Sequence, residues 1–374
     1  MLVNKRPIDG AVFHTKKRVS WGLPVEPPSS LHTTHKDVPM KKYLFIAAAA
    51  GVASLASQVA VYAQVSAPEA QVNALEGLFG KNAGARRSGA KGVCASGYFV
   101  GNEAGRALSS ASVFKGERVP VVARFSIGGG NPKASDKGRS VRGLALQFNL
   151  PGGESWLMAN VSAPVFFVAR PDQFVPFLQA RTPDPATGKP DPEKLKTFNE
   201  ANPETTRQGA YLAKAPVPTS YGTVNYWGNN AFEFVNAKNE SQFVRWQFLP
   251  EAGTAGLTDE ELKTMPDDFL ADELRKRVAT APVAFGFSVQ LADKSDPLTD
   301  PTQVWPESRK VVSVGRLVID AVVPGVGGAC ETVTFNPLVL PNGIKPSADP
   351  VLLARGAPYA ISLGRRIVDA PKSK

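Results

Sequence analysis

The chain has 374 residues, with 43 Lys and Arg against 33 Asp and Glu, which gives a formal net charge of +10. Half of that excess lies in residues 1–63, where eight basic and three acidic side chains stand, so the remaining 311 residues are only modestly basic. Those 311 residues contain no Lys/Arg block interleaved with aromatic residues, so the sequence predicts no nucleic-acid-binding surface.

Residues 40–63 have the pattern of a signal peptide. Two lysines precede an apolar run from Leu44 to Ala53, and Val61-Tyr62-Ala63 has the small-x-small form of a cleavage site. We expect cleavage after Ala63, a periplasmic or secreted product, and a functional domain over residues 64–374.

Residues 1–39 show no sustained periodicity, and we interpret them as a disordered extension or a mis-assigned start, with translation beginning at Met40. An uncleaved anchor is the alternative, since Tyr43–Ala63 has 21 residues and about 20 suffice to cross a bilayer. Three polar residues in the second half of this segment favour cleavage and no stable membrane insertion.

All three histidines, His14, His32 and His35, precede the expected cleavage site. Histidine titrates near neutral pH and is the commonest metal ligand. Its absence from the processed chain excludes His-based triads, His–zinc sites and His-ligated haem. Cys94 and Cys330 can pair in an oxidising compartment, but sequence alone does not bring their Cα atoms within bonding range. A disulfide and two buried thiols therefore remain alternatives.

The first half of the domain is predicted to begin with a helix and continue with strands. In residues 64–90, four apolar residues between Val72 and Phe79 lie at helical spacing. Further on, apolar and polar residues alternate with the two-residue period of a half-buried strand. The predicted strands of this half are Val93–Val100, Val119–Ile127, Gly143–Leu150 and Pro164–Val168.

The second half is predicted to mix helices and strands. Residues 181–220 are rich in proline and charge, which indicates a long connection with one or two short helices. Thr258 is expected to cap a helix that runs to about Ala279, with Glu261 completing a capping box. A closing helix is expected over Pro350–Arg366. The predicted strands of this half are Ala231–Val235, Phe243–Leu249, Val283–Leu291 and Val311–Val318.

This order of elements predicts an α+β protein with an antiparallel β-barrel and flanking helices. The sequence shows no internal repeat. No glycine-rich loop follows a strand and opens a helix, so a nucleotide site is not predicted, and Gly128-Gly129-Gly130 is interpreted as a flexible turn.

The segment from Arg355 to Tyr359 carries the most useful pair of side chains. On a helix these two residues are four apart and share a face. A guanidinium beside a phenol favours the phenolate, which is a competent ligand for ferric iron. Arg366 returns to the same face and could hold a carboxylate. Taken alone, the pair is more typical of a packed helix with a solvated charge, and Pro358 removes one helix hydrogen bond.

Collinear segments along nearly the whole domain resemble the catalase family. The expected leader and the compact length resemble the small catalase-related peroxidases of that family. The resemblance implies a catalase-like antiparallel barrel of about eight strands with flanking helices. The matching segments are Arg86–Gly92, Val122–Ser126, Val141–Phe148, Ala163–Phe167, Asn230–Asn236, Asp296–Pro306, Phe335–Pro337, Leu340–Ile344 and Asp349–Tyr359.

The same resemblance implies a b-type haem whose iron is held by Tyr359, with Arg355 as the cation that keeps the tyrosine ionised. Guanidinium groups suit the two propionates of haem. Without the resemblance, each arginine is equally explained by a surface salt bridge. The positions that match haem contacts are Arg86, Arg124 and Arg366 for the propionates and Phe174 for a stacked ring.

The departures from the family lie on the distal side. Gly89 stands where the family has a histidine, and Ser126 matches the serine that steadies that histidine. The distal asparagine of the family matches Val161, with Asn160 one residue away. The histidine moves a proton from peroxide to the departing oxygen, a contribution of about 10²–10⁴-fold. Ser126 and Asn160 are therefore only weak catalytic candidates, and the alternative carboxylates are Glu103, Asp136 and Glu154.

Three functions remain. The favoured one is an exported haem-dependent peroxidase that reduces hydrogen or organic peroxides with a small-molecule reductant, weakened by the missing histidine. A non-catalytic haem-binding protein on the same barrel is the alternative. A haem-free barrel that binds lipid or a partner is disfavoured by the Arg355–Tyr359 pair. We expect a monomer or small homo-oligomer.

Overall fold

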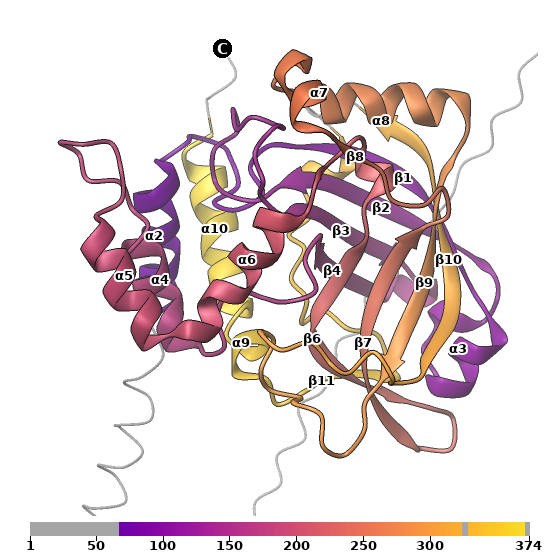
Figure 1. Cartoon of the computed structure of the whole chain (residues 1–374). Helices are drawn as coiled ribbons and strands as arrows, with labels where there is room; N and C mark the ends of the chain where they lie inside the picture. Colours follow the sequence, from indigo (N-terminus) through magenta and orange to yellow (C-terminus); the bar gives the residue numbers. More distant parts are fainter. Residues whose placement is uncertain (1–66, 324–327, 371–374) are drawn as a thin grey trace, which may run out of the picture. The chain divides into compact units, whose positions relative to one another are not determined.

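The computed structural model describes residues 67–323 and 328–370, which form a β-barrel with helices packed around it (Figure 1). The three histidines, the expected extension and the expected signal peptide all lie outside the described residues. Within the described ranges, no helix is both long and apolar enough to cross a lipid bilayer.

Eight strands close into one antiparallel barrel. Hydrogen-bonded neighbours follow the order β4-β3-β2-β1-β10-β9-β7-β6, and β6 returns to β4 through the pair Val161↔Trp227. A short strand, β11 (Ile344–Pro346), extends the sheet from β6. The barrel strands are β1 (Gly92–Gly101), β2 (Arg118–Ile127), β3 (Arg142–Asn149), β4 (Ser155–Val161), β6 (Tyr226–Val235), β7 (Ser241–Pro250), β9 (Val283–Leu291) and β10 (Val311–Val323).

Aromatic side chains fill the interior of the barrel. The Phe99 ring lies 5.4 Å from the Phe148 ring and 5.7 Å from the Phe287 ring, and Trp156 stacks on Phe148 at 5.2 Å. All four side chains are buried. Because side chains occupy this space, a site for a large planar ligand has to lie outside the barrel wall.

The alternation of β2 determines which residues face that outer side. Ala123 and Phe125 belong to the interior core, so Arg124 and Ser126 lie on the opposite face of the strand. Cys94 of β1 packs in a separate small cluster on the outer face. The predicted arginine and serine therefore lie on the same face of one strand, two residues apart.

The helices gather mainly on one side of the barrel (Figure 1). Helix α2 contacts both α4 and α10, and α8 packs against β10. Two two-residue strands, β5 (Val217–Pro218) and β8 (Gly256–Leu257), pair with each other. The helices are α2 (Pro68–Phe79), α3 (Glu103–Leu108), α4 (Phe174–Gln179), α5 (Pro192–Ala201), α6 (Arg207–Lys214), α7 (Asp259–Thr264), α8 (Phe269–Thr280), α9 (Pro350–Leu353) and α10 (Gly356–Val368).

Most predicted elements are confirmed, and the capping box is among them. The Thr258 hydroxyl accepts from the Glu261 amide, and the Glu261 carboxylate accepts from the Thr258 amide. The predicted helix to Ala279 is, however, two helices, because Pro266 follows Thr264 closely and disfavours helical backbone before it. The predicted closing helix is likewise divided into α9 and α10.

The prediction of a strand over Pro164–Val168 is wrong. This segment is irregular, and the strand before it, β4, was not predicted. Proline offers no amide hydrogen to a ladder. β4 instead pairs with β3 across the turn Pro151–Gly153, in which Gly152 and Gly153 have φ of 75° and 81°.

Candidate functional site

Tyr359 and Arg355 meet at the first turn of α10. Arg355 immediately precedes this helix, and its Nη2 donates a hydrogen bond of 2.6 Å to the Tyr359 hydroxyl oxygen. Pro358 is the third residue of the helix, where a backbone N–H has no partner inside the helix, so this proline costs no helical hydrogen bond. The four-residue spacing thus gives direct contact between a guanidinium and a phenol oxygen.

Two further side chains hold Arg355 in place. Arg355 Nη1 donates to Asn230 Oδ1 at 3.2 Å, and Asn230 Nδ2 donates to Asp349 Oδ2 at 2.7 Å. Asp349 is completely buried and also caps α9 by accepting from the Val351 amide. Burial raises the pKa of Asp349, while its bond from Asn230 opposes that shift. Sequence reasoning missed both roles, although Asn230 and Asp349 each begin a segment that resembles the catalase family.

Three arginines from different parts of the chain form an arginine cluster: Arg86, Arg124 and Arg366. Arg86 precedes β1, Arg124 lies on the outer face of β2, and Arg366 comes from α10. Burial and the positive charges of Arg124 and Arg366 lower the pKa of Arg86 to about 9. A guanidinium with that pKa is still charged at neutral pH, so the cluster concentrates positive charge.

The arginine cluster also holds the backbone on either side of it. Arg124 donates to the carbonyl oxygens of Gly89 and Ala90, at 2.6 and 3.0 Å. Arg86 Nη2 donates to the Cys330 carbonyl oxygen at 2.7 Å. These bonds fix the direction in which the remaining N–H groups point.

Three buried N–H groups of the arginine cluster have no hydrogen-bond partner within the part of the chain that the structure describes: Arg86 Nε, Arg124 Nε and Arg366 Nη1. A buried donor without a partner costs about 1–3 kcal/mol. The Tyr359 phenol lies close enough to Arg86 to act on its charge. Unmatched donors and excess positive charge beside this phenol fit a ligand that carries carboxylates, as haem does.

Phe174 belongs to a half-buried aromatic group with Phe166 and Phe167. Its ring centroid lies 5.5 Å from that of Phe167, and the Phe166 and Phe167 centroids are 4.4 Å apart. The Arg355 guanidinium carbon is 6.0 Å from the Phe166 centroid. The irregular segment wrongly predicted as a strand thus brings the Phe166 ring to Arg355, with Phe167 packed against Phe166.

On the distal side, Gly89 lies beside Ser126. A Cβ added to Gly89 would be 3.1 Å from Ser126 Oγ, and one added to Gly143 would be 2.5 Å from the same oxygen. Gly89 has φ of 63°, in the left-handed region that favours glycine. These two glycines keep side chains away from the Ser126 hydroxyl.

The Asn160 side chain is buried and makes two hydrogen bonds to other barrel strands. Its Nδ2 donates to the Leu144 carbonyl oxygen at 2.9 Å, and its Oδ1 accepts from Trp246 Nε1 at 2.7 Å. One donor and one acceptor of the amide are therefore used inside the barrel. Its neighbour Val161 pairs with Gly143 at the end of β3.

The three candidate carboxylates each have an ion-pair or hydrogen-bond partner of their own. Glu103 is the first residue of α3, Glu154 directly precedes β4, and Asp136 is buried. Their partners are Arg106 for Glu103, Lys91 for Asp136, and the Asn342 amide for Glu154.

Cys94 and Cys330 form a disulfide with a Cα–Cα distance of 5.4 Å. This finding decides between the two alternatives that the sequence left open. Both cysteines are buried with Phe335, and Cys94 is the ladder partner of Arg124. The bond therefore attaches the segment around Cys330 to the strand beside the arginine cluster.

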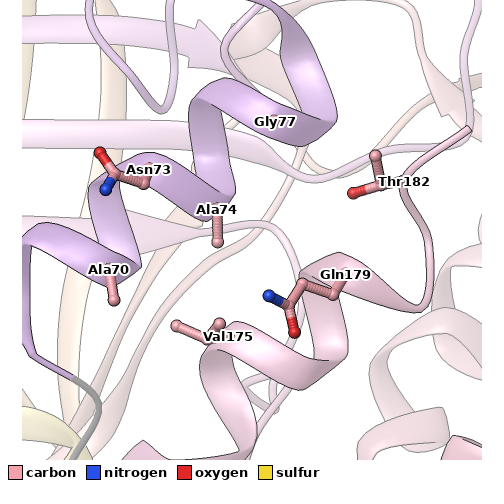
Figure 2. A pocket seen from close by; sticks show the side chains of 7 residues that line it. All are labelled: Ala70, Asn73, Ala74, Gly77, Val175, Gln179 and Thr182. Carbon is pink, nitrogen blue, oxygen red and sulfur yellow. The ribbon is translucent and has the colours of Figure 1, made fainter.

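A separate shallow groove of about 520 Å³ lies between α2 and α4 (Figure 2). Small and neutral side chains line it, and none of the predicted site residues is among them. Its lining residues are Ala70, Asn73, Ala74, Gly77, Val175, Gln179 and Thr182.

Comparison with known proteins decides the family. Residues 81–369 match the family described as catalase. The chain belongs to the catalase family. That family implies a haem cofactor, in agreement with the unmatched donors of the arginine cluster.

Two similar relatives match this chain over nearly their whole length. The chain is 44% identical over 326 residues to a catalase-related peroxidase of Synechococcus elongatus, covering 87% of this chain and 96% of that protein. It is 33% identical over 300 residues to a catalase-related peroxidase of Mycolicibacterium paratuberculosis, covering 80% and 94%. These relatives support a peroxidase-type function.

A solved bacterial catalase has the same fold. It superposes with a TM-score of 0.69 at 23% identity, over 79% of this chain and 61% of that one. The prediction of a catalase-like α+β barrel with eight strands and flanking helices is therefore confirmed.

Proposed function

We propose that this catalase-family protein is an exported haem-dependent peroxidase that reduces hydrogen or organic peroxides with a small-molecule electron donor. The observation that carries the proposal is the 2.6 Å contact from Arg355 to the Tyr359 oxygen beside the arginine cluster. It supports Tyr359 as the iron ligand of a b-type haem. The remaining contacts to haem would come from Arg86, Arg124, Arg366 and Phe174.

Bound haem would supply the iron that binds and activates peroxide. Arg355 Nη2 lies 2.6 Å from the Tyr359 oxygen, the atom that would bind the iron, and orients it by a hydrogen bond. Asn230 and Asp349 keep that guanidinium in position. These contacts support Tyr359 as the residue that would hold the iron.

The distal side lacks an acid–base group, so we propose slow turnover. Gly89 carries no side chain, and the Ser126 hydroxyl beside it does not accept a proton at neutral pH. A positioned acid–base group contributes about 10²–10⁴-fold, and its loss should weaken peroxidase activity by a comparable factor. Disproportionation of peroxide at the rate of a full catalase is not expected.

The alternative is a non-catalytic haem-binding protein on the same barrel. The observation that favours it is again Gly89, since the missing side chain affects peroxide chemistry and leaves the tyrosine side unchanged. In this case the space beside Ser126 would receive a small ligand.

A peroxidase assay distinguishes the two functions. Haem-loaded protein and free haemin at equal concentration are supplied with hydrogen peroxide or an organic hydroperoxide and a chromogenic donor. We expect the protein to oxidise the donor faster than free haemin. A rate no faster than that of haemin would reject the enzyme and leave the haem-binding alternative.

Export and assembly complete the proposal. The leader pattern over residues 40–63 supports export, and the Cys94–Cys330 disulfide suits an oxidising compartment. We expect fractionation of cells that express the full chain to recover a shortened protein beginning near residue 64 outside the cytoplasm. We also expect a monomer or small homo-oligomer by light scattering.

A further inference from the structure

An acidic side chain reaches the arginine cluster from the segment that carries the disulfide. Among the described residues, Glu331 is the carboxylate that acts on the charges of all three arginines of the cluster. Its Oε1 lies 3.6 Å from Arg124 Nε, one of the buried groups without a hydrogen-bond partner. The Glu331 side chain is 37% exposed, whereas that of Arg124 is 6% exposed. Glu331 therefore approaches the cluster from the solvent side.

The disulfide fixes the backbone that carries Glu331. Cys330, the preceding residue, is bonded to Cys94, and the two sulfur atoms lie 3.7 and 3.8 Å from Glu331 Oε1. Arg86 also donates to the carbonyl oxygens of Cys330 and Glu331. The backbone at Glu331 is thus held both by a covalent bond and by the cluster itself.

The charges do not balance without a ligand. Three guanidiniums face one carboxylate, which leaves an excess of two positive charges, the number that two propionates would neutralise. A propionate that approaches Arg124 Nε also approaches the Glu331 carboxylate, and like charges at that distance repel. Glu331 therefore stands where a ligand carboxylate would bind.

We propose that Glu331, clamped by the Cys94–Cys330 disulfide, is an internal carboxylate that competes with one haem propionate for the arginine cluster and so limits the affinity for haem. This inference rests on the haem binding proposed above but not on peroxidase turnover. A metal ion held by Cys94, Cys330 and Glu331 is a poorer interpretation. The sulfur atoms are bonded to each other, and the arginines repel cations.

Haemin titration of Glu331→Gln tests the competition. We expect the dissociation constant for haemin to fall roughly three- to tenfold, because one negative charge leaves the binding site. Haemin dimethyl ester, which carries no propionate charge, should bind both proteins equally. Glu117→Gln is the matched control, since Glu117 is exposed and directly precedes β2, seven residues before Arg124. Its dissociation constants should equal those of the unmodified chain.

Three results would overturn the proposal: unchanged or weaker haemin binding by Glu331→Gln, an equal gain for the ester, or no haemin uptake by either protein. The haemin affinity can be measured whether or not the protein has peroxidase activity. A protein that binds haemin as expected but shows no turnover would reject the peroxidase and support the role of Glu331.

A double-mutant cycle tests the clamp. Cys94→Ala with Cys330→Ala removes the disulfide, both in the unmodified chain and in the Glu331→Gln variant. If the disulfide acts by holding the carboxylate, its removal should change the haemin dissociation constant less in the Glu331→Gln variant. An equal change in both backgrounds would show that the disulfide does not act through Glu331. The titration of Glu331→Gln alone does not depend on the folding of the disulfide-free variants.

Discussion

The two sides of the candidate haem site differ in how completely their polar groups are used. On the tyrosine side, Tyr359, Arg355, Asn230 and Asp349 form a continuous chain of hydrogen bonds that joins α10, β6 and α9. On the expected distal side, Ser126 lies beside glycines 89 and 143, which carry no polar side chain. In the proposed haem site, the groups that would hold iron are therefore separate from those that would move protons, so one set could be intact while the other is missing.

The largest expected effect is on the tyrosine side. Tyr359→Phe removes the oxygen that receives the Arg355 hydrogen bond, so the charge-transfer bands of a ferric tyrosinate should disappear from the absorption spectrum of haem-loaded protein. Tyr211→Phe, on α6, is a control that should leave the spectrum unchanged. An unaltered spectrum for Tyr359→Phe would reject Tyr359 as the ligand.

The next effect is a gain on the distal side. Gly89→His places an imidazole beside Ser126 Oγ and should raise the peroxidase rate at least about tenfold. The left-handed backbone at residue 89 should cost about 1–2 kcal/mol of stability, visible as a lower melting temperature. Ser88→His puts the same ring on the exposed neighbouring residue and should leave the rate unchanged. No gain with normal haem binding would show that residue 89 does not face the iron.

A smaller effect is expected from the positioning residue Asn230. Asn230→Ala frees Arg355 and leaves the buried Asp349 carboxylate with one hydrogen bond fewer, at a cost of about 1–3 kcal/mol in unfolding free energy. The tyrosinate bands should shift as well. Asn229→Ala is a matched control, because the buried amide of Asn229 has no hydrogen-bond partner among the described residues. Equal losses in the two variants would contradict a specific role for Asn230.

The smallest effect on activity is expected from Asn160. Its substitution tests whether this residue contributes to peroxide reduction. Asn160→Leu leaves Trp246 Nε1 without its acceptor and should lower stability by about 1–3 kcal/mol. The peroxidase rate per bound haem should stay the same, as measured on protein matched for haem content. A large loss of rate at unchanged stability would place Asn160 at the substrate.

Most of the barrel strands and the Arg355–Tyr359 contact were predictable because both depend on local periodicity. Alternation of apolar residues gave β2 and β3, and a spacing of four gave the pair on α10. The hydrogen bond from Asn230 to Asp349 joins residues that are 119 apart in the chain, and no local sequence pattern predicts it. The position of Glu331 depends in the same way on a disulfide that spans 236 residues.

β4 shows where prediction from local sequence fails. β4 follows β3 after a turn with two glycines at positive φ, and its apolar residues are less regularly spaced than those of β3. The segment after it, Pro164–Val168, is richer in β-branched and aromatic residues than β4, but its proline and its packing keep it irregular. Tertiary packing here overrides local composition.

The closure of the barrel has a consequence for its local stability. β4 and β6 share the single ladder pair Val161↔Trp227, whereas β4 and β3 share seven residue pairs. A junction with so few hydrogen bonds should open more often than the rest of the wall, so its amide hydrogens should exchange with deuterium first. Val161 is the cross-strand partner of Gly143, next to the Ser126 hydroxyl. Transient separation of β4 from β6 at this pair would let water molecules reach the Ser126 hydroxyl.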